Sequence, residues 1–255
     1  MFRHSLRGGP RLALLLFASL SGLTLTPAKA SAQSDNEATF WLAYMNQTAI
    51  TPNWAIWFDT HYNHGAFFVL RGGLVYNIEN GPGLTAGYAH LLLDPGDGSL
   101  DRNEHRPWAQ AVFPFRISDE WGFSQRIRSD FRFRESVAGG KVVNGWDFTV
   151  RLRWQSALTY WFPDLDVGRF FVQVADEVLI NFGPDAGPNH LDQNRLSLLL
   201  GMKMGRLTVR VGYMDRWIPG ATGMTAIHEH AALLWFNHLI PVSEAPDRVS
   251  EEGNP

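Results

Sequence analysis

The sequence predicts an all-β fold, a single antiparallel up-and-down transmembrane β-barrel of about 10–12 strands. Long segments in which polar and apolar residues alternate follow one another from residue 39 to residue 239, separated by turn-forming residues. No stretch longer than two helical turns carries an apolar stripe of helical period. The first 30 residues have the composition of an export signal.

The N-terminal segment combines a basic start with a short apolar run and a small-residue site. Arg3, Arg7 and Arg11 precede the apolar run, and Ala28-Lys29-Ala30 has the A-x-A form of a signal-peptide cleavage site. The run is shorter than the ~20 apolar residues that a transmembrane helix needs. We therefore expect residues 1–30 to be a cleaved signal peptide and residues 31–240 to form the barrel. Residues 241–255 are polar, contain three prolines and are expected to form a disordered tail.

Eleven segments have the alternation of strands, and most are long. Strands of soluble proteins average about 5–6 residues, whereas a tilted strand needs about 9–11 residues to cross a bilayer. Most of the segments reach that length. The expected strands are residues 39–46, 53–63, 67–78, 83–93, 104–117, 121–134, 146–160, 169–182, 192–204, 206–213 and 228–239.

Each segment has a charged face and an apolar face, because successive side chains of a strand point to opposite sides. Between residues 121 and 135, for example, Arg128 and Arg132 alternate with Phe131 and Phe133. A soluble barrel has the apolar face inside, and a membrane barrel has it outside against lipid. Strand length, the export signal and the aromatic content of ten Trp and 17 Phe favour the membrane arrangement.

The expected connections alternate between long and short. The long ones are residues 94–103, 135–145, 183–191 and 216–227, residues 162–168 are intermediate, and residues 118–120 and Gly205 form short turns. Bacterial outer-membrane barrels have long outer loops, short periplasmic turns and an even number of strands. The segment 39–46 makes the number odd, so it is expected to be an appendage unless a further strand exists.

Composition excludes several classes of protein. The net charge of −3 does not favour nucleic-acid binding, and a chain without cysteine forms no disulfides. Two pairs of histidines, His228 with His230 and His61 with His64, lie close in sequence, but a metal site needs three or four convergent ligands. We expect no metal and no cofactor.

Several stretches resemble one bacterial family, known as domain-of-unknown-function family 2490. They are residues 104–110, 175–183, 192–196, 211–214 and 230–237, of which the Asp-Gln-Asn-Arg run at residue 192 and the Asn-Phe-Gly run at residue 181 are the most specific. The resemblance extends over residues 36–239. It implies an exported or outer-membrane β-barrel of Gram-negative bacteria without an assigned activity or catalytic residues. Family members end in an aromatic residue on the last strand, a role for which Trp235 or Phe236 is available here.

Arginines on the polar faces are the strongest chemical feature of the sequence. Two consecutive strands carry most of them, so they are expected to crowd one interior wall and to need counter-charges in a confined space. They would form either a lattice of salt bridges or an anion-attracting pore or binding site. The candidate residues are Arg126, Arg128, Arg132, Arg134, Arg151, Arg153, Arg195 and Arg210, with Glu104, Asp130 and Glu177 as counter-charges.

Three functions follow as hypotheses. The first is an outer-membrane barrel of unassigned activity, serving as a narrow arginine-lined pore or a structural envelope component. Its partners would be outer-membrane lipid, lipopolysaccharide, the outer-membrane assembly machinery and small anionic solutes. The second is an enzyme that modifies lipid or lipopolysaccharide, which requires a Ser, a His and an acid that converge near one rim. The third is a soluble periplasmic β-barrel that binds an apolar ligand, with the arginines outside. No serine or histidine motif favours the enzyme.

Overall fold

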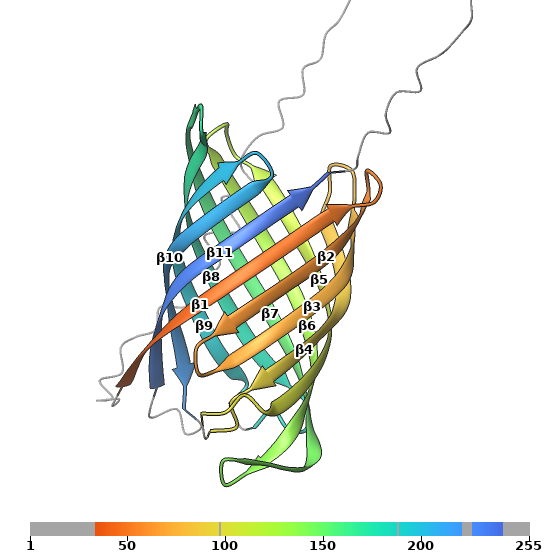
Figure 1. The fold of residues 1–255 in the computed structure, drawn as a ribbon, viewed down its shortest axis with the longest axis vertical. Helices are drawn as coiled ribbons and strands as arrows, with labels where there is room; N and C mark the ends of the chain where they lie inside the picture. Colours follow the sequence, from red (N-terminus) through yellow and green to blue (C-terminus); the bar gives the residue numbers. More distant parts are fainter. Residues whose placement is uncertain (1–33, 97, 188, 221–225, 242–255) are drawn as a thin grey trace, which may run out of the picture.

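Eleven strands form one closed barrel in the computed structural model (Figure 1). The structure describes residues 34–96, 98–187, 189–220 and 226–241, so the expected signal peptide and all but Pro241 of the expected tail lie outside it. The strands are β1 (Ser34–Ala49), β2 (Trp54–Asn63), β3 (Phe67–Asn77), β4 (Gly83–Leu93), β5 (Arg102–Arg116), β6 (Trp121–Ala138), β7 (Lys141–Leu165), β8 (Gly168–Phe182), β9 (Leu191–Met204), β10 (Leu207–Pro219) and β11 (Ala226–Ile240). The all-β barrel fold predicted from the alternation is confirmed.

Within the described residues, no helix is long and apolar enough to span a bilayer.

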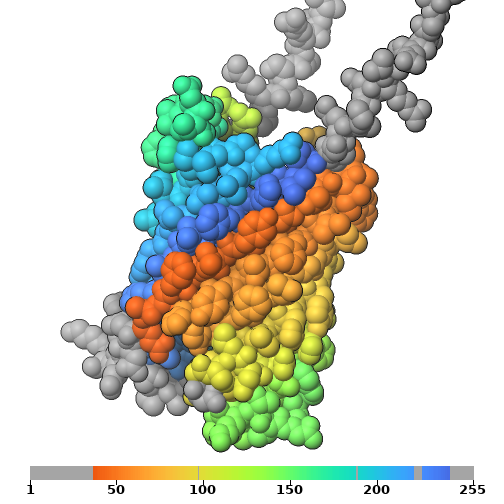
Figure 2. Space-filling view, viewed as in Figure 1, coloured from red at the N-terminus to blue at the C-terminus, as the bar shows by residue number. Residues whose placement is uncertain are grey.

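The barrel closes through a parallel pair of strands. All neighbours in sequence pair in antiparallel fashion, but β1 and β11 run in the same direction, from Ser34 opposite Ala226 to Thr48 opposite Ile240. An odd number of alternating strands requires this, because the first and the eleventh point the same way. The expectation of an even number was therefore wrong, and the segment 39–46 is an integral strand and no appendage. Figure 2 shows β1 and β11 packed side by side without a gap.

The two ends of the barrel differ in their connections. At one end, which we call the long-loop end, eight residues separate β4 from β5, eight separate β8 from β9 and six separate β10 from β11, and the hairpin between β6 and β7 lies there as well. At the other, the short-turn end, lie the turns 50–53, 78–82, 117–120, 166–167 and 205–206. The chain enters β1 at the long-loop end and leaves β11 at the short-turn end, as the parallel closure requires.

Residues 135–145 form strands and not the expected loop. The β6–β7 pairing continues to Ala138 opposite Lys141, and the hairpin projects beyond its neighbours (Figure 1). The turn is at Gly139 and Gly140, whose φ angles of 58° and 73° are those of a type I′ turn, which matches the twist of paired strands. The glycine-rich composition that indicated a loop marks only this two-residue turn. Likewise β7 reaches Leu165 and β10 reaches Pro219, inside segments expected to be loops.

The charged faces of the strands lie inside the barrel. On β6, Asp130 is fully buried and Arg128 is 4% exposed, whereas Ile127 and Phe131 are 47% and 41% exposed. The same contrast holds on β9, where Leu196 and Leu198 are exposed and Gln193 and Ser197 are buried. A soluble barrel would have the opposite arrangement, since burial of apolar surface is what stabilises it in water. The charged side chains therefore lie in the interior, and the outer wall is apolar.

A glycine allows one large ring to fit inside the barrel. Phe171 of β8 lies directly opposite Gly201 of β9, and its ring is 2% exposed. A Cβ atom at Gly201 would lie 2.0 Å from Cζ of Phe171, which is far inside van der Waals contact. Trp161 packs on the same ring, with 4.5 Å between the centroids. The interior near this point is filled by aromatic side chains.

Candidate functional site

The barrel encloses a cavity of about 380 Å³ whose lining is rich in arginine. This volume lies within the range of about 300–1,000 Å³ that is usual for small-molecule sites. Ten arginines line it, and they come from β3, β5, β6, β7, β9 and β10: Arg71, Arg106, Arg126, Arg128, Arg132, Arg151, Arg153, Arg195, Arg210 and Arg216. Alternation along each strand brings these side chains to the interior, because they lie on the face opposite the apolar residues.

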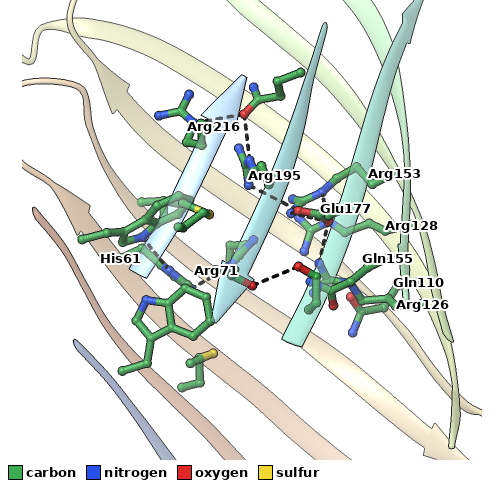
Figure 3. Close-up of a pocket in the computed structure, with 18 of the residues that line it drawn as sticks. His61, Arg71, Gln110, Arg126, Arg128, Arg153, Gln155, Glu177, Arg195 and Arg216 are labelled. Carbon is green, nitrogen blue, oxygen red and sulfur yellow. Dashed lines mark hydrogen bonds and ion pairs between the residues drawn. The ribbon is translucent and has the colours of Figure 1, made fainter. Parts of the chain in front are cut away.

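Glu177 of β8 holds three of these arginines (Figure 3). Arg153 Nε and Nη2 donate to the two carboxylate oxygens at 2.9 Å each, in a bidentate pair. Arg126 Nη2 donates to Oε1 at 2.6 Å, and Arg195 Nη1 lies 3.5 Å from Oε2. Glu177 therefore joins β6, β7 and β9 across its own strand.

Glu104 of β5 forms a second such centre. Arg132 donates to both of its oxygens, at 3.0 and 2.9 Å, and Arg106 Nε donates at 2.5 Å. Glu104 is fully buried, so its charge depends on these two guanidinium groups.

Asp130 of β6 is the third carboxylate that holds arginines. It accepts a hydrogen bond of 2.7 Å from Arg128 Nε, and its other oxygen lies 3.7 Å from Arg153 Nη1 and 4.0 Å from Arg106 Nη1. It therefore connects the pairs around Glu104 and Glu177 into one network.

Positive charge exceeds negative charge around the cavity. Besides Glu104, Asp130 and Glu177, the carboxylates paired with the ten arginines are Asp59 with Arg71, Asp192 with Arg151, and Glu229 with Arg216. Six carboxylates thus face ten arginines, which leaves an excess of four positive charges. In a confined space of low dielectric, such an excess attracts anions.

Three of the ten cavity arginines lie over aromatic rings. The guanidinium carbon of Arg128 is 4.3 Å from the ring centroid of Trp108, that of Arg195 is 5.3 Å from Trp41, and that of Arg210 is 5.6 Å from Phe171. Cation–π contacts at such distances hold the cationic groups in place without neutralising their charge.

Arg210 differs from the other nine. Among the described residues it has no hydrogen bond and no ion pair, and its Nε is buried without a partner. The ring of Phe171 is the contact that positions it. Its positive charge is thus fully available to a ligand.

The opposite wall of the cavity is mainly apolar. On β1–β4 the lining side chains are Trp41, Met45, Trp57, Phe67, Val69, Leu91 and Leu93, with His61 and Arg71 as the polar exceptions. Trp41 packs edge-on against Phe67 and Trp235, with ring centroids 5.1 and 6.3 Å apart. By contrast, the lining side chains of β5–β8 are all polar except Ala175. The cavity therefore has a cationic side and an aromatic side.

All eleven candidate residues predicted from the sequence lie on interior faces of their strands. Eight of them, Arg126, Arg128, Arg132, Arg151, Arg153, Glu177, Arg195 and Arg210, line the cavity. Glu104 and Asp130 lie behind it as counter-charges. Arg134 is opposite Glu104 and Asp147, nearer the long-loop end, and does not line the cavity.

Sequence reasoning missed Arg71, Arg106 and Arg216 and the aromatic side of the cavity. Arg106 could have been found, because it alternates with Glu104 in a stretch already singled out. Arg71 follows four apolar residues and precedes two glycines, so local alternation gave no sign of its orientation. Its partner Asp59 comes from the neighbouring strand, 2.7 Å away.

Histidines fall in two different environments. His61 is buried in the interior, where it accepts from Trp41 Nε1 at 3.1 Å and lies 2.8 Å from Arg71 Nη2. His228 and His230 lie on the outer face beside Asp215, at 3.1 and 3.6 Å. Across the part of the chain that the structure describes, no group of three or more His, Asp or Glu side chains is arranged to hold a metal ion.

A closed β-barrel with an apolar outer wall and an arginine-rich interior cavity is the class of protein that these observations define. The chain belongs to the family described as "Protein of unknown function (DUF2490)", which matches residues 38–226. The resemblance drawn from the sequence is confirmed.

Among solved structures, the chain is similar to one described as a NanC porin. The two chains are 11% identical with a TM-score of 0.43, over 75% of this chain and 94% of that chain. No curated protein matches this chain.

Proposed function

We propose that the protein is an outer-membrane β-barrel that forms a narrow, anion-selective pore. The observation that carries this proposal is the combination of an apolar outer wall with an interior cavity in which ten arginines face six carboxylates. Outer-membrane lipid and lipopolysaccharide would surround the wall, and small anionic solutes would enter the lumen.

The outer wall supports the membrane location. Exposed apolar side chains recur along the strands, among them Ile56, Leu70, Leu152, Trp154 and Leu198. Apolar patches of this extent are rare on soluble monomers and typical of surfaces that meet lipid or a partner. The described strands have 10–25 residues, enough to cross a bilayer at a tilt. A barrel also satisfies every backbone group within the bilayer. The export signal expected at residues 1–30 would bring the chain to the assembly machinery of that membrane.

The interior supports anion selectivity. Each of the six carboxylates is already held by at least one arginine, so a cation that enters meets no free negative charge among these residues. An anion meets the excess positive charge, in particular that of Arg210. Rings of Arg or Lys act in this way in pores for anions and phosphate.

The small cavity supports a narrow passage. Barrels of eight strands are filled with side chains, and those of 16–18 strands hold open channels, so eleven strands are intermediate. The ion-pair network around Glu104, Asp130 and Glu177 lies inside the barrel and narrows the space that is open to a solute. We therefore propose passage of small solutes only.

A planar-bilayer measurement tests the proposal. Protein whose folding is shown by heat-modifiable migration is inserted into a bilayer between unequal KCl concentrations. The reversal potential should have the sign set by chloride, and detergent without protein is the control. Conductance steps whose reversal potential has the sign set by potassium would contradict anion selectivity. The absence of conductance steps with folded protein would contradict the pore and favour the structural envelope component.

A further inference from the structure

Unpaired polar groups of β10 and β11 line the cavity beside its apolar surface. Arg210 of β10 and Trp235 of β11 are directly opposite in the strand register, and both line the cavity. Directly opposed residues on one face have Cβ atoms about 4.5–5.5 Å apart, so the two side chains enter the cavity from neighbouring points of its wall. Asn237, two residues further along the same face of β11, also lines the cavity.

These three side chains leave hydrogen-bonding groups without partners in the described structure. Arg210 Nε, Trp235 Nε1 and Asn237 Oδ1 are buried and unpaired, while the amide nitrogen of Asn237 lies 3.6 Å from Met45 Sδ. A guanidinium and an indole N–H are donors only. Two unpaired donors on neighbouring strands, one of them carrying an uncompensated charge, suit the oxygens of a carboxylate or a phosphate.

The surface beside these donors is aromatic. Trp41 and Phe67 pack with Trp235 on a buried apolar cluster that includes Leu199 and Met214. Arg195 lies over the ring of Trp41, while the arginines of β6 and β7 are held by Glu177, Asp130 and Glu104 and leave the rest of this surface uncovered. A fully hydrated anion would leave the aromatic surface in contact with water.

We propose that the cavity binds a small amphiphilic organic anion, with its carboxylate or phosphate at Arg210 and Trp235 and its apolar body against Trp41 and Phe67. This proposal rests on the barrel interior of the proposed function and names the class of solute for it. The cavity of about 380 Å³ limits the ligand to roughly one ring or a short chain. The electric field of the other arginines attracts the anion into the cavity, and Arg210 contacts it there.

The direct test is binding to the full barrel in lipid nanodiscs, measured by calorimetry. Two probes, 4-phenylbutyrate and phenyl phosphate, have both an anionic group and an apolar ring. Two partial probes are butyrate, which lacks the ring, and 4-phenylbutanol, which lacks the charge. We expect the two amphiphilic anions to bind at least about tenfold more tightly than either partial probe, since each lost contact removes one of two contributions. The better of the two anions identifies the head group.

Variants locate the site. Arg210→Gln should weaken binding of the amphiphilic anion about tenfold or more, and Trp235→Phe, which keeps the ring but removes the N–H, should weaken it less. Arg206→Gln is the matched control, because Arg206 is exposed at the neighbouring turn. Arg210→Lys keeps the charge and should retain part of the affinity. It is the variant to measure if Arg210→Gln fails to fold.

Two results would overturn the inference: 4-phenylbutanol binding as tightly as 4-phenylbutyrate, or an affinity that neither Arg210 variant lowers. These outcomes are separate from those of the pore experiment. Anion-selective conductance without binding dependent on Arg210 removes only the ligand site. Binding dependent on Arg210 without conductance removes only the pore.

Discussion

Arg128 of β6 and Arg153 of β7 lie directly opposite each other in the strand register, on the interior face of the barrel. Like charges in this position destabilise a pair of strands. Asp130 offsets the repulsion, because it binds Arg128 at 2.7 Å and its second oxygen lies 3.7 Å from Arg153. The cationic wall is thus stable only with its interleaved carboxylates.

Replacement of Asp130 should therefore destabilise the barrel strongly. Asp130→Asn leaves Arg128 without a counter-charge and removes the second carboxylate near Arg153 and Arg106, at a cost on the order of 3–5 kcal/mol for a broken buried pair. The midpoint of denaturant unfolding in detergent, followed by tryptophan fluorescence, measures this. Asp119→Asn is the control, since Asp119 pairs with Arg116 at an exposed turn. Equal midpoints for the two variants would show that the network does not hold the wall together.

Replacement of Glu177 should change selectivity as well as stability. Glu177→Gln removes the carboxylate that holds Arg126, Arg153 and Arg195, so it raises the excess positive charge by one. The reversal potential in a KCl gradient should move further towards that of chloride. Glu120→Gln, at an exposed turn, should leave it unchanged. A shift towards potassium would contradict the assignment of these arginines to the conducting path.

A methyl group at Gly201 should disturb the packing of Phe171. Gly201→Ala places a Cβ atom 2.0 Å from Cζ of Phe171, and overpacking of this kind costs about 1–3 kcal/mol. Gly122→Ala is the matched control on another strand, because nothing lies within 4 Å of its Cβ position. The unfolding midpoints of the two variants should differ, and a harmless Gly201→Ala would mean that Phe171 does not occupy the interior.

A charge on the outer wall should be tolerated at a turn but not in the middle of a strand. Leu198→Arg introduces a charge between the outward-facing Val174 and Tyr213, where lipid at the bilayer midplane imposes about 2–4 kcal/mol. Val167→Arg places the same charge at the exposed turn after β7 and should have little effect. Stability is compared by unfolding in lipid vesicles. Equal stability would remove Leu198 from the lipid-facing surface.

Alternation along the chain was sufficient to predict the eleven strands and the interior faces of the eight candidate arginines. It works because the two faces of each strand meet such different surroundings that the period-two pattern is strong, as between Ile127 and Asp130. The β6–β7 hairpin was missed because residues 135–145 contain glycines, which here serve only the two-residue turn.

Other features depend on contacts between distant parts of the chain. The parallel pairing of β1 with β11 joins segments about 190 residues apart, and no local pattern encodes it. Arg71 and Asp59 form an ion pair between neighbouring strands, and Arg71 is the single charged residue of β3. The aromatic side of the cavity was missed because Trp41 and Trp235 on an inner face read like any other apolar residues. Only closure of the barrel shows that they meet.

The most direct test of the account is the environment of the two faces in a bilayer. The chain has no cysteine, so single cysteines at Leu152 and Leu198 on the outer face and at Gln155 and Ser197 on the inner face can each carry a fluorescent label. In vesicles, the labels at Leu152 and Leu198 should be quenched by spin-labelled lipid and not by iodide, and those at Gln155 and Ser197 should not be quenched by the lipid. Lipid quenching of the inner labels, with iodide quenching of the outer ones, would contradict the account.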